Sequence, residues 1–232
     1  MWSSTAGQDA VRVLPDGCMD FLWSGGDLVI AGPDTHAHLF ERPFTTLTGL
    51  RFAPGFAPRV IGVPACEFTN TRVPLADVWT ARDMRRIVDE LSSADDPGTA
   101  LEDLALRMSG PLDADAALID HVVERARDGE QVSAVANVVG LSSRQLHRRC
   151  LDAFGYGAKT LTRVLRMVNA VELARSGVAF ADTAARTGYA DQAHFARDVK
   201  QLAGVPLGQL VSVPASAANR STELPSGSRT EA

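Results

Sequence analysis

Polar and basic side chains gather on one face of each of two helices expected in the C-terminal part of the chain. The first helix is expected over residues 143–154, where Leu146, Cys150 and Phe154 recur with helical spacing and leave the opposite face polar. Such side chains can reach base edges in the major groove or hydrogen-bond to phosphates. The residues expected to face outward, and so to contact DNA, are Ser143, Arg144, His147, Arg148, Gln192, His194, Arg197 and Lys200.

A turn with the same small residues precedes each of these helices. In the first copy Ala136 stands four residues before Gly140, and in the second Ala184 stands four residues before Gly188. In a helix–turn–helix motif the alanine lets two helices cross closely, and the glycine takes a backbone conformation that a Cβ would penalise. The sequence therefore predicts two helix–turn–helix motifs.

The start of each outward-facing helix carries a capping signal. Ser142 is the expected N-cap of the first helix, and Gln145 completes a capping box. Ala190 stands at the corresponding place in the second motif, so Asp191 is expected to cap there instead. An acidic residue at a helix start also suits the helix dipole.

A long amphipathic helix is predicted between the two motifs, over residues 158–175. At 1.5 Å per residue it would be about 27 Å long, and successive major grooves on one face of DNA lie about 34 Å apart. A rigid connection of this length can hold two helices in adjacent grooves. Arg166 of this segment is assigned to packing against a neighbouring element rather than to DNA.

Charge is divided unevenly along the chain. The whole sequence has 232 residues and a formal net charge of −5, which by itself argues against binding to nucleic acid. Residues 1–130, however, sum to −10, and residues 131–212 sum to +5. A basic C-terminal part beside an acidic N-terminal part is consistent with DNA binding by the former. The acidic part could restrain the basic part, which is a hypothesis that deletion of residues 1–110 would test.

The segment 131–210 resembles the arabinose-regulator (AraC/XylS) family of transcription factors. The matching residues are Val132, Val135, Ala136, Gly140, Leu141, Ser142, Leu146, Arg148, Phe154, Gly155, Arg166, Ala170, Ala184, Gly188, Tyr189, Asp191, Gln192, His194, Phe195, Arg197 and Lys200. The resemblance implies DNA binding by both helices and regulation of transcription from a promoter. The chain departs from the family pattern at Val199, Gln209 and Leu210, which affects the expected packing of the last helix.

The N-terminal residues are predicted to form a small β domain followed by helices. Turn residues such as Pro15-Asp16-Gly17 separate short apolar runs. The expected strands cover residues 19–23, 28–31, 36–40, 45–52 and 59–63, and the expected helices cover 83–91, 101–108 and 115–127. Residues 13–20, 31–33, 49–52 and 73–79 resemble a short β domain found ahead of such DNA-binding modules. That domain is about half as long as the sugar-binding arm of better-known relatives, so the resemblance supplies no effector.

The helix expected over residues 83–91 has two interpretations. Met84, Ile87, Val88 and Leu91 form one apolar face. Such a face belongs either to the core of the protein or to a dimer interface, and both interpretations stay open at this point.

A metal or thiol sensor is the main alternative for the N-terminal part. Cys18, Cys66, His36 and His38 are the residues that could form it, but they lack close ligand spacing. Cys150 falls on the apolar face of its helix and is expected to pack in the core. We therefore predict no metal site and no cofactor. A reactive-cysteine or small-molecule sensor or enzyme, with a passenger DNA-binding module, is the competing hypothesis.

Several classes of protein are disfavoured by the sequence. No run of eighteen apolar residues occurs, the first ten residues do not form a signal peptide, and the dispersed cysteines suit a reducing cytoplasm. No nucleophile-elbow, P-loop, zinc-protease or dinucleotide-binding motif is present, so an enzyme is not expected. The expected location is the cytoplasm.

The predicted fold class is α+β, with a short β-rich N-terminal domain and an all-α C-terminal domain that holds two helix–turn–helix motifs joined by a linker helix. The predicted divisions are a sensor or dimerisation domain at 1–80, a helical connector at 81–111, a DNA-binding domain at 112–212 and a disordered tail at 213–232. The expected partners are double-stranded promoter DNA and RNA polymerase. A small-molecule effector and a second copy of the chain stay open as further partners.

Overall fold

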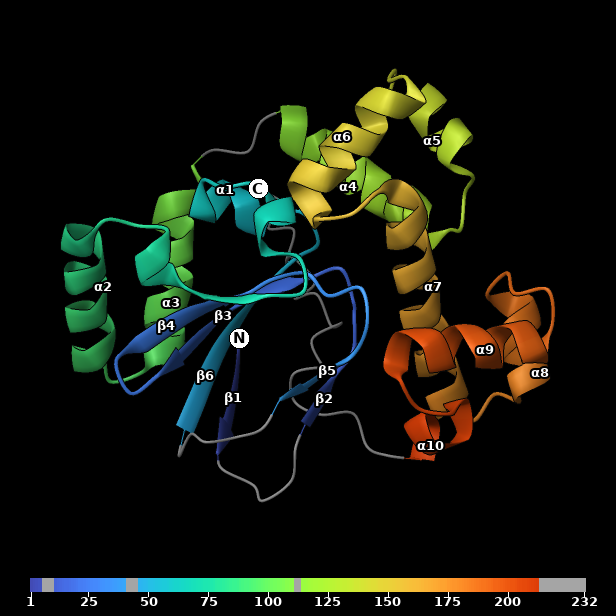
Figure 1. The fold of residues 1–232 in the computed structure, drawn as a ribbon, viewed down its shortest axis with the longest axis horizontal. Coiled ribbons are helices and arrows are strands. Elements are labelled where there is room, and N and C mark those ends of the chain that lie inside the picture. The colour runs from blue at the N-terminus through green and yellow to red at the C-terminus, as the bar shows by residue number, and fades with distance from the viewer. Residues whose placement is uncertain (6–10, 41–45, 111–113, 213–232) are drawn as a thin grey trace, which may run out of the picture.

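A computed structural model describes residues 1–5, 11–40, 46–110 and 114–212. The tail predicted to be disordered, residues 213–232, lies outside the described residues. A β-rich N-terminal region is followed by a helical region, as predicted (Figure 1). Among the helices of the described residues, none combines the length and the apolar character needed to cross a membrane.

The larger sheet has five antiparallel strands in the order β1-β6-β3-β4-β7. Its strands are β1 (Trp2–Thr5), β3 (Met19–Ser24), β4 (Asp27–Ala31), β6 (Thr46–Phe52) and β7 (Arg72–Pro74). A second sheet pairs β2 (Val11–Val13) with β5 (His38–Phe40). Four of the predicted strands are therefore confirmed, while β1, β2 and β7 were not predicted.

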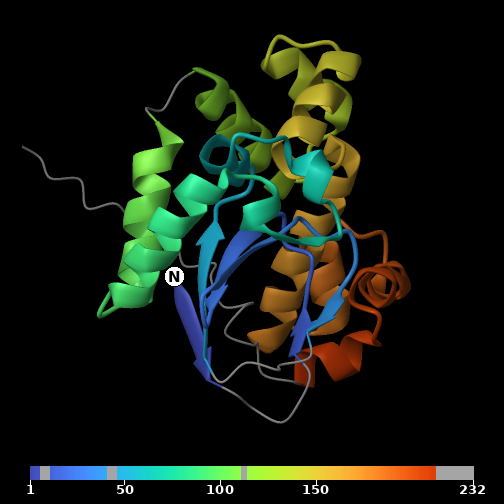
Figure 2. The same cartoon turned by 60° about the vertical axis from the view of Figure 1, so that its left-hand side comes forward.

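Two helices cover one face of the larger sheet. They are α2 (Ala81–Ser93) and α3 (Pro97–Ser109), and they lie on the side of the sheet away from β2 and β5 (Figures 1 and 2). Met84, Ile87 and Leu91 of α2 are buried in the same core as Phe21 and Ile30 of the sheet. The apolar face predicted for residues 83–91 is thus part of the core.

The strand predicted over residues 59–63 is wrong, because this segment lies in the short helix α1 (Ala57–Ile61). Pro58 stands in the first turn, where its fixed φ suits a helix and its missing N–H is not needed. Gly62 ends the helix with φ of 79° and donates its N–H to the carbonyl of Pro58. Single 3-10 turns follow at Ala65–Phe68 and Leu75–Asp77.

The C-terminal helices form two bundles at the two ends of one long helix, α7 (Figure 1). Their bounds are α4 (Ala114–Arg127), α5 (Val132–Val138), α6 (Ser143–Phe154), α7 (Ala158–Arg175), α8 (Phe180–Arg186), α9 (Gln192–Ala203) and α10 (Leu207–Ser212). The helices α5–α6 and α8–α9 are the two predicted helix–turn–helix motifs. Leu207 and Leu210 are buried, so the last helix packs despite its departures from the family pattern.

The predicted turn and capping residues behave as expected. Gly140 and Gly188 have φ of 68° and 76°. Ser142 and Gln145 form the capping box of α6. Asp191 caps α9, where its Oδ1 accepts the backbone N–H of His194 at 2.6 Å. Local sequence signals therefore determine where both outward-facing helices begin.

Candidate nucleic-acid interface

The helix α6 presents its polar face to solvent. Leu146, Cys150 and Phe154 are buried at 1% exposure or less and hold α6 against the first bundle. The four residues of this helix predicted to contact DNA, Ser143, Arg144, His147 and Arg148, are all exposed. The imidazole of His147 also lies over the turn to α7, because its Nδ1 is only 2.6 Å from where a Cβ at Gly157 would stand.

The helix α9 repeats this arrangement in the second bundle. Phe195 and Val199 are fully buried, whereas Gln192, Arg197 and Lys200 are exposed. His194 is half-buried and meets the ring of Tyr189 edge-on, with centroids 5.2 Å apart. The structure thus places the eight predicted contact residues in two sets of four, one on each second helix of a motif.

Other basic residues near these helices are bound to acidic groups of the protein. Nη1 of Arg149 lies 2.5 Å from Oδ1 of Asp115, and Nε of Arg163 donates to Oδ1 of Asp198 at 2.5 Å. Arg166 lies 4.2 Å over the ring of Tyr189, which supports its assignment to packing. Neither acidic partner is predicted from the sequence, although Asp198 stands directly before the core residue Val199.

The N-terminal region contacts the second bundle through its small sheet and the following loop. Nη1 of Arg12 donates to the carbonyl of Ala203 at 2.9 Å, and the N–H of Ala37 donates to the carbonyl of Leu202 at 2.6 Å. Leu14 is 7% exposed and is part of the hydrophobic core built on α7, α9 and α10. These contacts fasten the end of α9 to β-rich structure.

The N-terminal region also contacts the first bundle. Oγ1 of Thr69 donates to the carbonyl of Gly155, which follows α6, at 3.0 Å. The backbone at Gly55 approaches α4 and α6 so closely that a Cβ there would stand 2.4 Å from Ile119 and 2.8 Å from Phe154. Both motifs are therefore packed against the same β-rich region.

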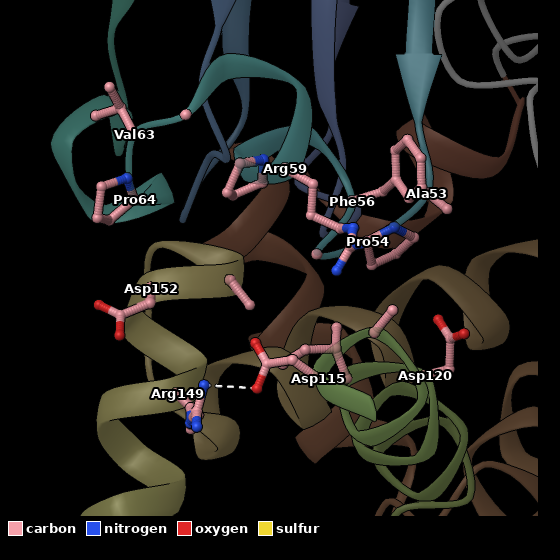
Figure 3. A pocket seen from close by; sticks show the side chains of 16 residues that line it. Ala53, Pro54, Phe56, Arg59, Val63, Pro64, Asp115, Asp120, Arg149 and Asp152 are labelled. Carbon is pink, nitrogen blue, oxygen red and sulfur yellow. Dashed lines mark hydrogen bonds and ion pairs between the residues drawn. The ribbon is translucent and has the colours of Figure 1, made fainter. Parts of the chain in front are cut away.

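A cleft of about 400 Å³ lies between the N-terminal region and the first bundle (Figure 3). One wall is α1 with the turn before it, including Phe56 and Arg59. The other wall is formed by α4 and α6, where Asp115 and Arg149 make their ion pair. In Figure 3 the side chain of Arg59 points from the upper wall toward α4 and α6. A molecule in this cleft would touch both regions.

Cys18 lies beside a polar cluster formed by Arg51, Asp16 and Asp20. Nη1 of Arg51 lies 2.9 Å from Asp16 Oδ2, and its Nε lies 3.0 Å from Asp20 Oδ1. Burial, followed by the negative charge of Asp16, raises the pKa of the Cys18 thiol well above its usual value. Within the described ranges, no three histidine, cysteine or acidic residues are grouped as metal ligands.

We expect iodoacetamide at neutral pH to modify exposed Cys66 at least about tenfold faster than Cys18, because only the thiolate reacts and a raised pKa depletes it. Cys150 is buried, and burial raises its pKa to about 12, so it should also be protected. Mass spectrometry of timed samples measures the three rates, and urea-unfolded protein, in which the rates should converge, is the control. Fast labelling of Cys18 in the folded protein would contradict this prediction and support the reactive-cysteine hypothesis.

Comparisons with known proteins support the C-terminal assignment. Residues 135–212 match the family described as a helix-turn-helix domain, and residues 1–74 match a domain of unknown function, DUF6597. No curated protein sequence matches the chain.

Among solved structures, the chain is similar to ToxT from Vibrio cholerae O395, with 9% identity and a TM-score of 0.45 over 91% of this chain and 97% of that one. It is also similar to wild-type ToxT from Vibrio cholerae strain SCE256 with a bound unsaturated fatty acid, with 9% identity and a TM-score of 0.48 over 90% and 92% of the two chains. The two motifs and the match of residues 135–212 assign this segment to the helix-turn-helix DNA-binding domains.

Proposed function

We propose that this regulator inserts α6 and α9 into successive major grooves of promoter DNA. The observation that carries the proposal is the pair of solvent-facing polar helices at the two ends of the eighteen-residue helix α7. The proposed contacts to bases and phosphates are Ser143, Arg144, His147, Arg148, Gln192, His194, Arg197 and Lys200. In helix–turn–helix proteins the N-terminal residues of the second helix contact base edges, and here Ser143, Arg144 and Gln192 stand in those first turns.

Selection of bound DNA from a random pool tests this proposal. We expect the full-length protein to enrich duplexes with two half-sites about 10–10.5 base pairs apart. Affinity for the enriched sequence should fall with salt, with a slope of about −0.9 in log–log form for each phosphate neutralised. Failure to enrich any sequence, or an affinity indifferent to salt, would contradict the proposal.

We further propose that the chain divides into a sensor domain at 1–80, a helical connector at 81–111 and a DNA-binding domain at 112–212, and that the first restrains the last. Its support is the set of contacts that Arg12, Thr69 and Gly55 make with the two bundles. The restraint is tested by the DNA affinity of Gly55→Ala. A small-molecule effector bound in the cleft beside Arg149 would change the contacts between the N-terminal region and the first bundle. Adding such an effector should therefore change the affinity for DNA.

The remaining partners follow from this function. We propose RNA polymerase as the protein partner, because a regulator bound at a promoter lies close to it. A second copy of the chain is proposed only for operators that show four half-sites in the selection experiment. We propose the cytoplasm as the location of the protein. Co-purification with polymerase on operator DNA is the measurement that checks the partner.

A further inference from the structure

The recognition helix α9 carries a buried carboxylate, that of Asp198, at 5% exposure. Its Oδ1 accepts a hydrogen bond from Nε of Arg163 at 2.5 Å. Its Oδ2 accepts one from the hydroxyl of Tyr189 at 3.0 Å, and Nη2 of Arg166 lies 3.6 Å from the same oxygen. One carboxylate therefore contacts three side chains, and loss of any one of them leaves the buried charge less well compensated.

The three partners come from two other elements. Arg163 and Arg166 lie on α7, and Tyr189 lies in the turn between α8 and α9. The guanidinium of Arg166 also stacks on the ring of Tyr189, 4.2 Å from its centre. Burial and the charge of Asp198 raise the pKa of Tyr189, so its hydroxyl keeps the proton that it donates. Asp198 thus joins the linker helix, the turn and the recognition helix.

The first motif also has an ion pair at this position of its second helix, but there the second helix carries the basic residue instead of the acidic one. Asp198 is the seventh residue of α9, and Arg149 is the seventh residue of α6. Arg149 pairs with Asp115 of α4, but the side chains are 46% and 49% exposed. Exposed pairs contribute little to stability, whereas removal of one partner of a buried pair is costly. In the Asp198 pair the carboxylate is buried, with its side chain 6% exposed, although Arg163 is 37% exposed, so loss of the pair at Asp198 is expected to have the larger effect.

We propose that Asp198 is a positioning residue, which sets the angle between α9 and α7 and so the spacing of the two half-sites. Apolar contacts such as those of Phe195 are non-directional and define the orientation of the helix less sharply than hydrogen bonds do. A carboxylate held by guanidinium and hydroxyl groups has defined geometry. The proposal rests on the DNA-binding function proposed above, and it assigns Asp198 no contact with DNA.

The first test measures spacing preference. Full-length Asp198→Asn and Arg163→Gln are titrated with duplexes whose half-sites are moved apart or together by single base pairs. We expect both variants to lose about tenfold or more at the wild-type spacing and to bind the spacings more equally. Each should keep wild-type affinity for a duplex with only the half-site of α6. Asp115→Asn is the matched control and should keep the wild-type preference.

The second test needs no DNA and separates failure of this proposal from failure of the proposed function. Nitroxide labels are placed by Ser143→Cys and Gln192→Cys in a Cys66→Ser background, and pulsed electron resonance measures the distance between them. We expect a broader or shifted distribution in Asp198→Asn and in Arg163→Gln, but not in Asp115→Asn. Unchanged distances, or equal losses on one-site and two-site duplexes, would overturn the positioning role. If the wild type selects no DNA, the distance measurement still decides the question.

Discussion

Replacing Arg148 by alanine is expected to weaken binding to the selected operator by about 5- to 150-fold, and replacing Arg197 should do the same. Both arginines are exposed on the second helix of a motif, with Phe154 or Phe195 holding the opposite face in the core. Neither has a packing role that would be lost. Fluorescence titration with the operator measures the affinity, and thermal unfolding should stay close to that of the wild type.

Arg85→Ala is the matched control, since it removes an exposed arginine from α2 in the N-terminal region. It should leave the operator affinity unchanged apart from a small long-range charge effect. Because Arg148 and Arg197 lie in separate bundles, their losses in binding free energy should add in the double variant. Wild-type affinity in both single variants would rule out the assigned recognition faces.

Gly55→Ala is expected to lower the free energy of unfolding by more than its backbone conformation explains. Gly55 has φ of 83°, and a left-handed conformation costs an alanine about 1–2 kcal/mol. The added Cβ would also stand 2.4 Å from Ile119, and such overpacking costs about a further 1–3 kcal/mol unless the two regions separate. Urea unfolding measures the loss, and separation should appear as tighter binding to operator DNA.

Gly62→Ala isolates the backbone contribution. Gly62 has φ of 79°, and in the described part of the chain no atom lies within 4 Å of the position of a new Cβ. It should therefore cost about 1–2 kcal/mol and leave DNA affinity unchanged. Equal effects of the two substitutions on stability and on DNA binding would mean that the contact between the regions does not restrain the motifs.

The elements that could be predicted from the sequence are those set by neighbouring residues. The bounds of α6 and α7 follow from caps and from apolar periodicity, and the structure confirms them. The segment 59–63 was misassigned because Val60 and Ile61 favour a strand, while the helix depends on Pro58 and Gly62 at its ends. The short strands β1, β2 and β7 carry too few residues for a periodic signal.

In the candidate site, too, the features set by neighbouring residues could be predicted, and those that depend on distant residues could not. The outward residues of α6 and α9 could be predicted because exposure follows from helical period alone. Two hydrogen bonds join residues that are distant in sequence, that of Arg163 to Asp198 and that of Thr69 to Gly155. No local sequence pattern predicts such bonds. The close approach at Gly55 is likewise a property of two packed surfaces. The sequence therefore predicts which residues of α6 and α9 could contact DNA, but not the contacts that hold these two helices in position.

The burial of Leu14 has a consequence for how the chain is made. The other members of its hydrophobic core begin at Val164 and extend to Leu210. During synthesis, Leu14 leaves the ribosome long before these partners, and the core closes only when nearly the whole described chain has emerged. Contacts of such sequence separation slow folding and leave apolar surface exposed in the interval. We therefore expect the apolar surface around Leu14 to stay open to chaperones until α9 and α10 have emerged and cover it.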